Sequence, residues 1–175
     1  MAVAKAQNTV KSVSNSSSSP FTSGSITTSA GNLVIAGVCL FSPGGGNPLC
    51  TQVVFDGVTN TTPDIHKQHT VTTDSHMYLF SFPNVSAGAK TASVTVTRPE
   101  RCTIFLVEVS GAATSSVADG VGASAQGNSM NPASGNFTST NTEILFANMY
   151  KSAKLTLLQN IIYKSKTLKD NQLVF

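Results

Sequence analysis

Two long apolar runs constrain this chain more than any other feature of its 175 residues. The first covers residues 33–41 and reads LVIAGVCLF, and the second covers residues 102–109 and reads CTIFLVEV. Both are rich in β-branched and aromatic residues, and both fall short of the roughly 20 apolar residues that a membrane helix needs. Because neither run alternates between apolar and polar positions, each predicts a central strand covered on both faces, or on one face plus a partner.

Shorter segments with a period of two accompany these runs. Residues 76–82 place three aromatic side chains on one face, and residues 91–97 alternate valine with threonine. Clusters of Gly, Pro, Asn and Asp separate the segments, most clearly PGGGNP at residues 43–48. This pattern predicts an all-β fold, an antiparallel β-sandwich of the jelly-roll kind, with an immunoglobulin-like sandwich as the second choice.

One stretch of the chain echoes another. Residues 25–36 and 136–147 both read as a short strand, a tight polar turn and a long apolar strand. Two such units near the two ends of the chain fit a sandwich whose first and last strands meet in one sheet, as happens in jelly rolls.

Composition favours strands over helices. Charged residues make up 11% of the chain, whereas Ser and Thr supply roughly a quarter, more than a globular domain usually has. We therefore expect polar but uncharged side chains to coat the outside. Helix formers are not concentrated before residue 150, which argues against a helical bundle.

The formal charge of +3 comes from thinly spread Lys and Arg residues, with mild clustering near the end of the chain. The clustered lysines are Lys151, Lys154, Lys164, Lys166 and Lys169. Nucleic-acid binding usually needs a dense basic patch with interleaved aromatic residues, so a solvated face is the preferred interpretation.

The chain divides, by its composition, into an arm and one domain. Residues 1–20 have few large apolar side chains and end in SSSSP, which predicts an N-terminal arm with weak structure of its own. Residues 21–175 are predicted as a single sandwich domain. Its last part, residues 151–175, reads either as closing strands at 155–163 and 172–175 or as an extension with a short helix. Residues 59–75 are predicted as an exposed loop, and residues 111–135 as a long loop that is functional or contains an irregular edge strand.

The cysteines indicate the compartment. Cys39, Cys50 and Cys102 are odd in number, and two of them lie inside the apolar runs, so we expect small buried hydrophobes and no disulfide framework. The first residues lack the apolar core of a secretory signal. We therefore expect synthesis in a reducing cytoplasm and no membrane partner.

One cluster has ligand-like residue types: Asp64, His66, His69, Asp74 and His76. Such a set could hold a divalent ion, because imidazoles and carboxylates are common metal ligands. In a strand, however, His66 and His69 would lie on opposite faces, whereas Asp74 and His76 would share one. Solvated loop residues are therefore the preferred interpretation, and a metal site is the alternative.

No catalytic arrangement stands out. Glu108 lies inside the second apolar run, and we expect it at an outward or sheet-edge position, paired with Arg98 or Arg101, in preference to a buried catalytic acid. The chain has no Gly-x-Ser-x-Gly motif, and the glycines at 44–46 lack the Lys of a phosphate loop. The sequence thus predicts no enzyme, no catalytic, cofactor-binding or metal-ligating residues, and no cofactor.

The order of the segments resembles the β-sandwich surface domains of tailed-phage virions, which include head decoration or cement proteins and tail-associated domains. Three segments carry the resemblance: TSAGNLVIA at residues 28–36, VSAGA at 85–89, and VEVSGAAT at 107–114 before a Ser/Gly-rich loop. Together they cover roughly residues 22–150. Such families typically continue into an aromatic-containing turn and a closing strand, and the Lys-rich tail of this chain departs from that pattern.

The resemblance implies a structural virion protein, made in the host cytoplasm and resident in the virion. It would be a decoration or cement subunit that binds the major capsid protein or other virion proteins and forms a homo-oligomer, with a trimer favoured. Residues 1–20 would anchor it to a neighbouring subunit. The alternative is a carbohydrate- or receptor-binding module, in which loops 43–48, 59–75 and 111–135 form the recognition surface.

Overall fold

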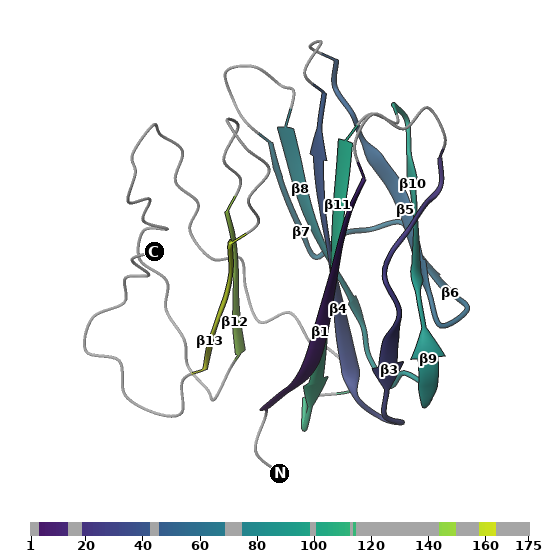
Figure 1. The fold of residues 1–175 in the computed structure, drawn as a ribbon, viewed down its shortest axis with the longest axis vertical. Helices are drawn as coiled ribbons and strands as arrows, with labels where there is room; N and C mark the ends of the chain where they lie inside the picture. The colour runs from purple at the N-terminus through teal and green to yellow at the C-terminus, as the bar shows by residue number, and fades with distance from the viewer. Residues whose placement is uncertain are drawn as a thin grey trace, which may run out of the picture. The chain divides into compact units, whose positions relative to one another are not determined.

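A computed structural model describes residues 4–13, 19–42, 46–68, 75–98, 101–112, 114, 144–149 and 158–163, with the backbone alone at 9–13, 144–149 and 158–163. The chain forms two compact units, residues 1–118 and 119–175. All the regular elements in the described ranges are strands (Figure 1). The predicted all-β class is therefore confirmed for this part of the chain.

The larger sheet of the first unit, sheet A, has five antiparallel strands in the order β1-β11-β4-β8-β7. These strands are β1 (Ala4–Val13), β4 (Leu33–Phe41), β7 (Ile65–Gln68), β8 (Ser75–Phe82) and β11 (Arg101–Ser110). The two predicted apolar runs are β4 and β11, which lie side by side within the sheet. Both are thus central strands, as expected from their apolar sequences.

The second sheet, sheet B, has four antiparallel strands in the order β2-β10-β5-β6. They are β2 (Phe21–Thr22), β5 (Cys50–Phe55), β6 (Val58–Asn60) and β10 (Ala92–Val96). Two further short strands, β3 (Ile26–Thr28) and β9 (Gly88–Lys90), pair with each other. The ribbon in Figure 1 shows β5 and β10 lying across from the strands of sheet A, so the two sheets form a sandwich.

Strand pairing in this unit is nested from the outside of the chain inwards. β1 pairs with β11, β2 with β10, β4 with β8, and β5 with β6. The remaining ladders, β11 with β4 and β10 with β5, join these pairs into the two sheets. The first and last strands of the described sandwich therefore meet in one sheet.

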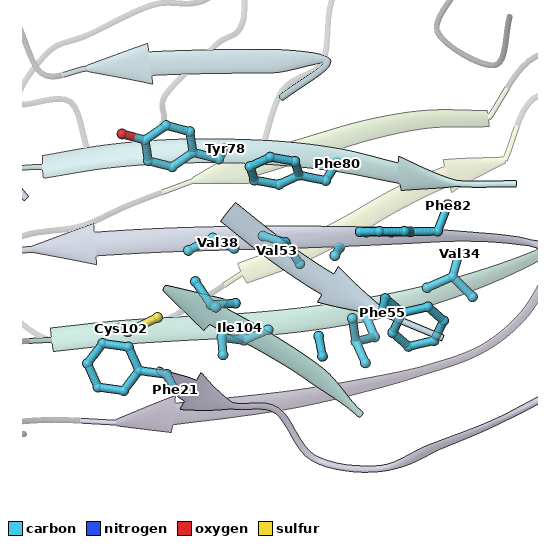
Figure 2. Packing of buried hydrophobic residues seen from close by; sticks show 14 of the residues in the cluster. Phe21, Val34, Val38, Val53, Phe55, Tyr78, Phe80, Phe82, Cys102 and Ile104 are labelled. Atoms are coloured by element: carbon cyan, nitrogen blue, oxygen red, sulfur yellow. The ribbon is translucent and has the colours of Figure 1, made fainter. Parts of the chain in front are cut away.

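Apolar side chains from the facing sides of both sheets fill the space between them (Figure 2). From sheet A come Val34, Val38, Tyr78, Phe80, Phe82, Cys102 and Ile104, and from sheet B come Phe21, Val53, Phe55, Val94 and Val96. The rings of Phe55 and Phe82 meet across the sandwich, with centroids 5.6 Å apart. The strict alternation in β8 and β10 puts their apolar residues on this inner side, which confirms the predicted period of two.

β4 and β11 are buried on both faces. Val34 and Ile104 face the inner core, while Ile35, Cys39 and Val107 belong to the opposite face and are at most 8% exposed. This double burial explains why neither sequence alternates. Cys39 and Cys102 are buried and Cys50 is half-buried, and all are free thiols, as predicted.

In the second unit, residues 144–149 and 158–163 form antiparallel strands β12 (Ile144–Met149) and β13 (Leu158–Tyr163). The long apolar strand expected at the end of residues 136–147 and the closing strand expected at 155–163 are thus confirmed over 144–149 and 158–163, and the helical alternative does not apply to 158–163. The short strand expected at the start of residues 136–147, the strand expected at 172–175 and most of the loop expected at 111–135 lie outside the described residues. The single domain over residues 21–175 stays a prediction.

Two regions differ from what their sequences suggest. The predicted arm contributes β1, a ten-residue strand held by β11. The predicted loop at 59–75 is wrong in part, because it contains the end of β6 and all of β7. β1 and β7 are short or polar edge strands of sheet A. Backbone hydrogen bonds to a neighbouring strand hold them in place, so their side chains show little of the pattern that predicts a strand.

Candidate binding surface

The outer face of sheet B is largely polar, and its side chains lie in rows that cross the strands. In its central row Thr22, Ser93, Val54 and Thr59 lie next to one another on β2, β10, β5 and β6. In the adjoining row Thr95 of β10 lies opposite Gln52 of β5. These side chains are half-buried or exposed, whereas the sequence neighbours of Ser93 and Val54 point into the core.

No residue in the four strands of sheet B is charged. An ion pair lies just beyond it, where Lys90 Nζ is 2.6 Å from Asp56 Oδ1 at the turn between β5 and β6. Near the same turn, Val58 is 58% exposed and is the one large hydrophobic side chain so exposed in the described part of the chain. The expectation of a polar, uncharged coat is met most fully on this face.

Asp56 secures the turn that borders this face. It adopts a left-handed conformation (φ 50°) before Gly57, and its carboxylate accepts hydrogen bonds from the backbone N–H of Ser86 (2.6 Å) and from the Ser86 hydroxyl (2.8 Å). The hydrogen bond from Lys90, together with those from Ser86, lowers the pKa of Asp56 to about 2. The turn is therefore tied to the chain just before β9.

The ligand-like cluster is only partly brought together. His66 of β7 and His76 of β8 meet, with Nε2 of His66 3.0 Å from Nδ1 of His76. Asp64 is exposed at the start of β7, and His69 and Asp74 lie outside the described residues. His76 is 1% exposed, so the prediction of a solvated loop residue is wrong for it. The antiparallel register of β7 and β8 brings the two rings together, and sequence spacing alone does not reveal that register.

The geometry of the two imidazoles is that of a hydrogen bond. Their planes lie within 13° of each other and their centroids are 5.3 Å apart, so the two nitrogens point at one another. Two imidazoles on a tetrahedral zinc ion would aim both nitrogen lone pairs at the metal, about 2.0–2.1 Å away, and not at each other. One nitrogen therefore donates and the other accepts. Within the described residues, no group of three His, Cys, Asp or Glu side chains is placed to hold a metal.

Tyr78 extends this pair into a stack of rings. His66 lies over Tyr78 with centroids 4.3 Å apart, and the Tyr78 hydroxyl is 3.4 Å from Nδ1 of His76. Burial, and to a smaller degree the charge of Lys67, lowers the pKa of His66, and burial raises the pKa of Tyr78. The stack continues to Phe80, 6.3 Å from Tyr78, and Tyr78 and Phe80 both belong to the core.

Glu108 is buried, and the expectation that it lies outward or at a sheet edge, paired with an arginine, is wrong. It is 1% exposed. Its Oε1 accepts hydrogen bonds from the Ser29 N–H (2.6 Å) and from Asn32 Nδ2 (2.8 Å), and its Oε2 accepts one from Gln7 Nε2 (2.7 Å). The same amide group of Gln7 also donates to the carbonyl of Thr27. The carboxylate thus joins β1, the turn before β4, and β11.

The arginines proposed as partners lie elsewhere. Arg101 stacks over the ring of Phe41, with Cζ 5.6 Å from its centroid, and Arg98 packs against Gly46. The signal available in the sequence was the position of Glu108 inside an apolar run with no polar face, and on its own side of β11 the residues Cys102, Ile104 and Leu106 all belong to the core. Glu108 continues that series inward, where a carboxylate persists only if hydrogen bonds satisfy it.

Comparison with known proteins gives no match: no family model, no curated protein and no solved structure is similar to this chain. The part of the chain that the structure describes also contains no helix long and apolar enough to cross a membrane.

Proposed function

We propose that this chain works by binding and not by catalysis, as a structural subunit on the surface of a virion. It would be synthesised in the host cytoplasm and dock on the major capsid protein or another virion protein, as a decoration or cement subunit, and would assemble as a homo-oligomer, with a trimer favoured. The resemblance of residues 28–36, 85–89 and 107–114 to such domains motivates the proposal.

The uncharged outer face of sheet B is the observation that carries it. Protein interfaces are depleted of charged residues at their centres, because burying an unpaired charge costs several kcal/mol. A row of Thr22, Ser93, Val54 and Thr59 can be buried against a partner without that cost. Its hydroxyls can still form the direct and water-mediated hydrogen bonds that interfaces contain.

We also propose that the sandwich is a jelly roll. A jelly roll has eight strands in two sheets, with two Greek keys. The nested pairs β1 with β11, β2 with β10, β4 with β8 and β5 with β6 supply eight such strands and support this assignment over the immunoglobulin-like alternative. β7 adds to the edge of sheet A beside β8.

Two experiments on purified virions test the proposal: detection of the chain in them, and one charge introduced on the outer face of sheet B. Mass spectrometry of particles should find the chain, and Ser93→Lys should lower its occupancy by about tenfold or more, because a difference of about 1.4 kcal/mol already gives tenfold. Ala89→Lys is the matched control, since Ala89 is exposed on β9, outside sheet B.

Two results would overturn the proposal. Particles that lack the chain would remove the virion function, and equal occupancy for Ser93→Lys and Ala89→Lys would remove the role of sheet B. A glycan array bound by the multimeric protein, with binding lost when loop 43–48 is replaced, would instead support the carbohydrate-binding alternative.

A further inference from the structure

β1 forms an edge of sheet A. It pairs with β11 along its whole length, from Ala4 opposite Ser110 to Val13 opposite Cys102, and no strand in the described part of the chain pairs with its other side. Its sequence, AKAQNTVKSV, has only two large apolar residues. Backbone hydrogen bonds to β11 therefore supply most of what attaches this strand to the sandwich.

The sequence that follows β1 is polar. Residues 14–18 read SNSSS, with no apolar side chain, before the chain reaches β2 (Phe21–Thr22) in sheet B. β1 is thus a polar ten-residue strand joined through a polar connection to the rest of the fold.

One side chain of β1 makes the pairing specific. Gln7 donates to the buried carboxylate of Glu108, at 2.7 Å, and to the carbonyl of Thr27 in β3. The register of the β1–β11 ladder shifts between Lys5 and Gln7, next to this contact. Gln7 therefore fixes the register of β1 against β11, whereas backbone hydrogen bonds alone would allow β1 to shift along β11.

Without β1, the sandwich would expose a long acceptor edge. β11 is ten residues long and buried on both faces, and its free N–H and C=O groups would then be open to any extended chain. Glu108 Oε2 would also lose its donor from Gln7. Such an edge selects a strand that carries an amide at the position of Gln7.

We propose that the edge of β11 is a strand-acceptor site and that its occupant in the assembled protein is β1 of a second copy of this chain. Every copy carries both the donor strand with Gln7 and the acceptor with Glu108, so an exchanged strand makes the same contacts as an intrachain one. Protein concentration then favours exchange, as in other domain-swapped oligomers. The inference holds whether or not the chain docks on a capsid.

The test uses the full chain with two separate cysteine variants. Ala4 and Ser110 are register partners, and the Ser110 hydroxyl donates to the Ala4 carbonyl at 3.3 Å. Partners in an antiparallel pair lie about 4.5–5.5 Å apart at Cα, which suits a disulfide. Chains with Ala4→Cys and chains with Ser110→Cys are mixed, unfolded and refolded together, and oxidised. Only exchange between copies brings these two thiols together.

Exchange predicts a disulfide-linked heterodimer on a non-reducing gel. It should form more than about tenfold faster than in a mixture of Ala4→Cys with Thr59→Cys, because neighbouring thiols have effective concentrations far above those in solution. Thr59 is exposed on β6 and is not a register partner of β1.

A heterodimer that forms no faster than this control would overturn the proposal, and so would a wild-type chain that is monomeric by light scattering at every concentration measured. The variant with both Ala4→Cys and Ser110→Cys in one chain distinguishes the origins of β1. Intrachain pairing gives a monomeric disulfide, and exchange gives covalent oligomers.

Discussion

The ring of Phe105 in β11 lies directly on the backbone of Gly37 in β4, its partner in the antiparallel ladder. A Cβ atom added to Gly37 would come within 1.8 Å of Phe105 Cζ. Phe105 is 4% exposed, so the ring has little room to move away. Glycine is required here because the ring occupies the space that any side chain would take.

Gly37→Ala should therefore destabilise the fold by about 1–3 kcal/mol, the usual cost of overfilling a packed core. Thermal or urea unfolding measures the change. Combined with Phe105→Leu, the same substitution should cost less than it does alone, because the ring that it meets is gone. Strictly additive effects in this double-mutant cycle would contradict the contact.

Glu108→Gln should also destabilise the fold by about 1–3 kcal/mol, the range for a buried hydrogen-bonding group left without its partner. A glutamine offers one acceptor oxygen and turns an N–H toward the donors Gln7, Ser29 or Asn32. The control is Asp64→Asn, which removes a carboxylate from an exposed position and should change stability by less than about 0.5 kcal/mol. Equal unfolding midpoints for the two variants would refute this account of Glu108.

Asp56→Asn should reduce stability at neutral pH but not in strong acid. The pKa of Asp56 is about 2 in the folded protein and 3.8 ordinarily, so its contribution is present above about pH 4 and is lost as pH falls toward 2. Asparagine tolerates the left-handed conformation, so the backbone effect of the change is small. The difference in melting temperature between the wild type and this variant should shrink across that window. A difference that stays constant from pH 7 to pH 2 would contradict the prediction.

The native thiols should resist alkylation. Burial raises the pKa of Cys50 to about 12 and raises that of Cys102 as well, so both remain protonated and unreactive at pH 8. Iodoacetamide should leave the mass of the native chain unchanged, modify all three cysteines in denaturant, and rapidly label an added Thr59→Cys. Rapid labelling of the native wild type would show that Cys50 is more accessible than its burial indicates.

Strands with an apolar run or strict apolar alternation could be predicted from the sequence, but which strands pair with each other could not. β4, β8, β10 and β11 follow from unbroken apolar runs or strict alternation, because burial on two faces or one leaves that mark. β1 and β7 are polar edge strands whose hydrogen bonds leave no such mark. Glu108 illustrates the limit for the site, since its burial depends on donors from Gln7 and Asn32, far away in sequence.

The sequence composition predicts that the protein has a polar, uncharged surface, but it does not predict on which sheet that surface lies. The low share of charge and the excess of Ser and Thr predict a polar coat, and Thr95 and Ser93 read as the outer positions of an alternating strand. That Thr22 and Thr59 join them in one row depends on the order of β2, β10, β5 and β6, which follows from the topology of the whole sandwich.

The nested pairing of strands also determines when each strand can find its partner during translation. β1 emerges from the ribosome well before its partner β11, which begins only at Arg101. At about 5–20 residues per second, β1 waits on the order of 5–20 s before its own acceptor edge exists. Pairings between ends so distant in sequence also form slowly after release. On a polysome, where neighbouring copies are at staggered stages of translation, a finished β11 edge can meet the waiting first strand of the next chain before that chain completes its own.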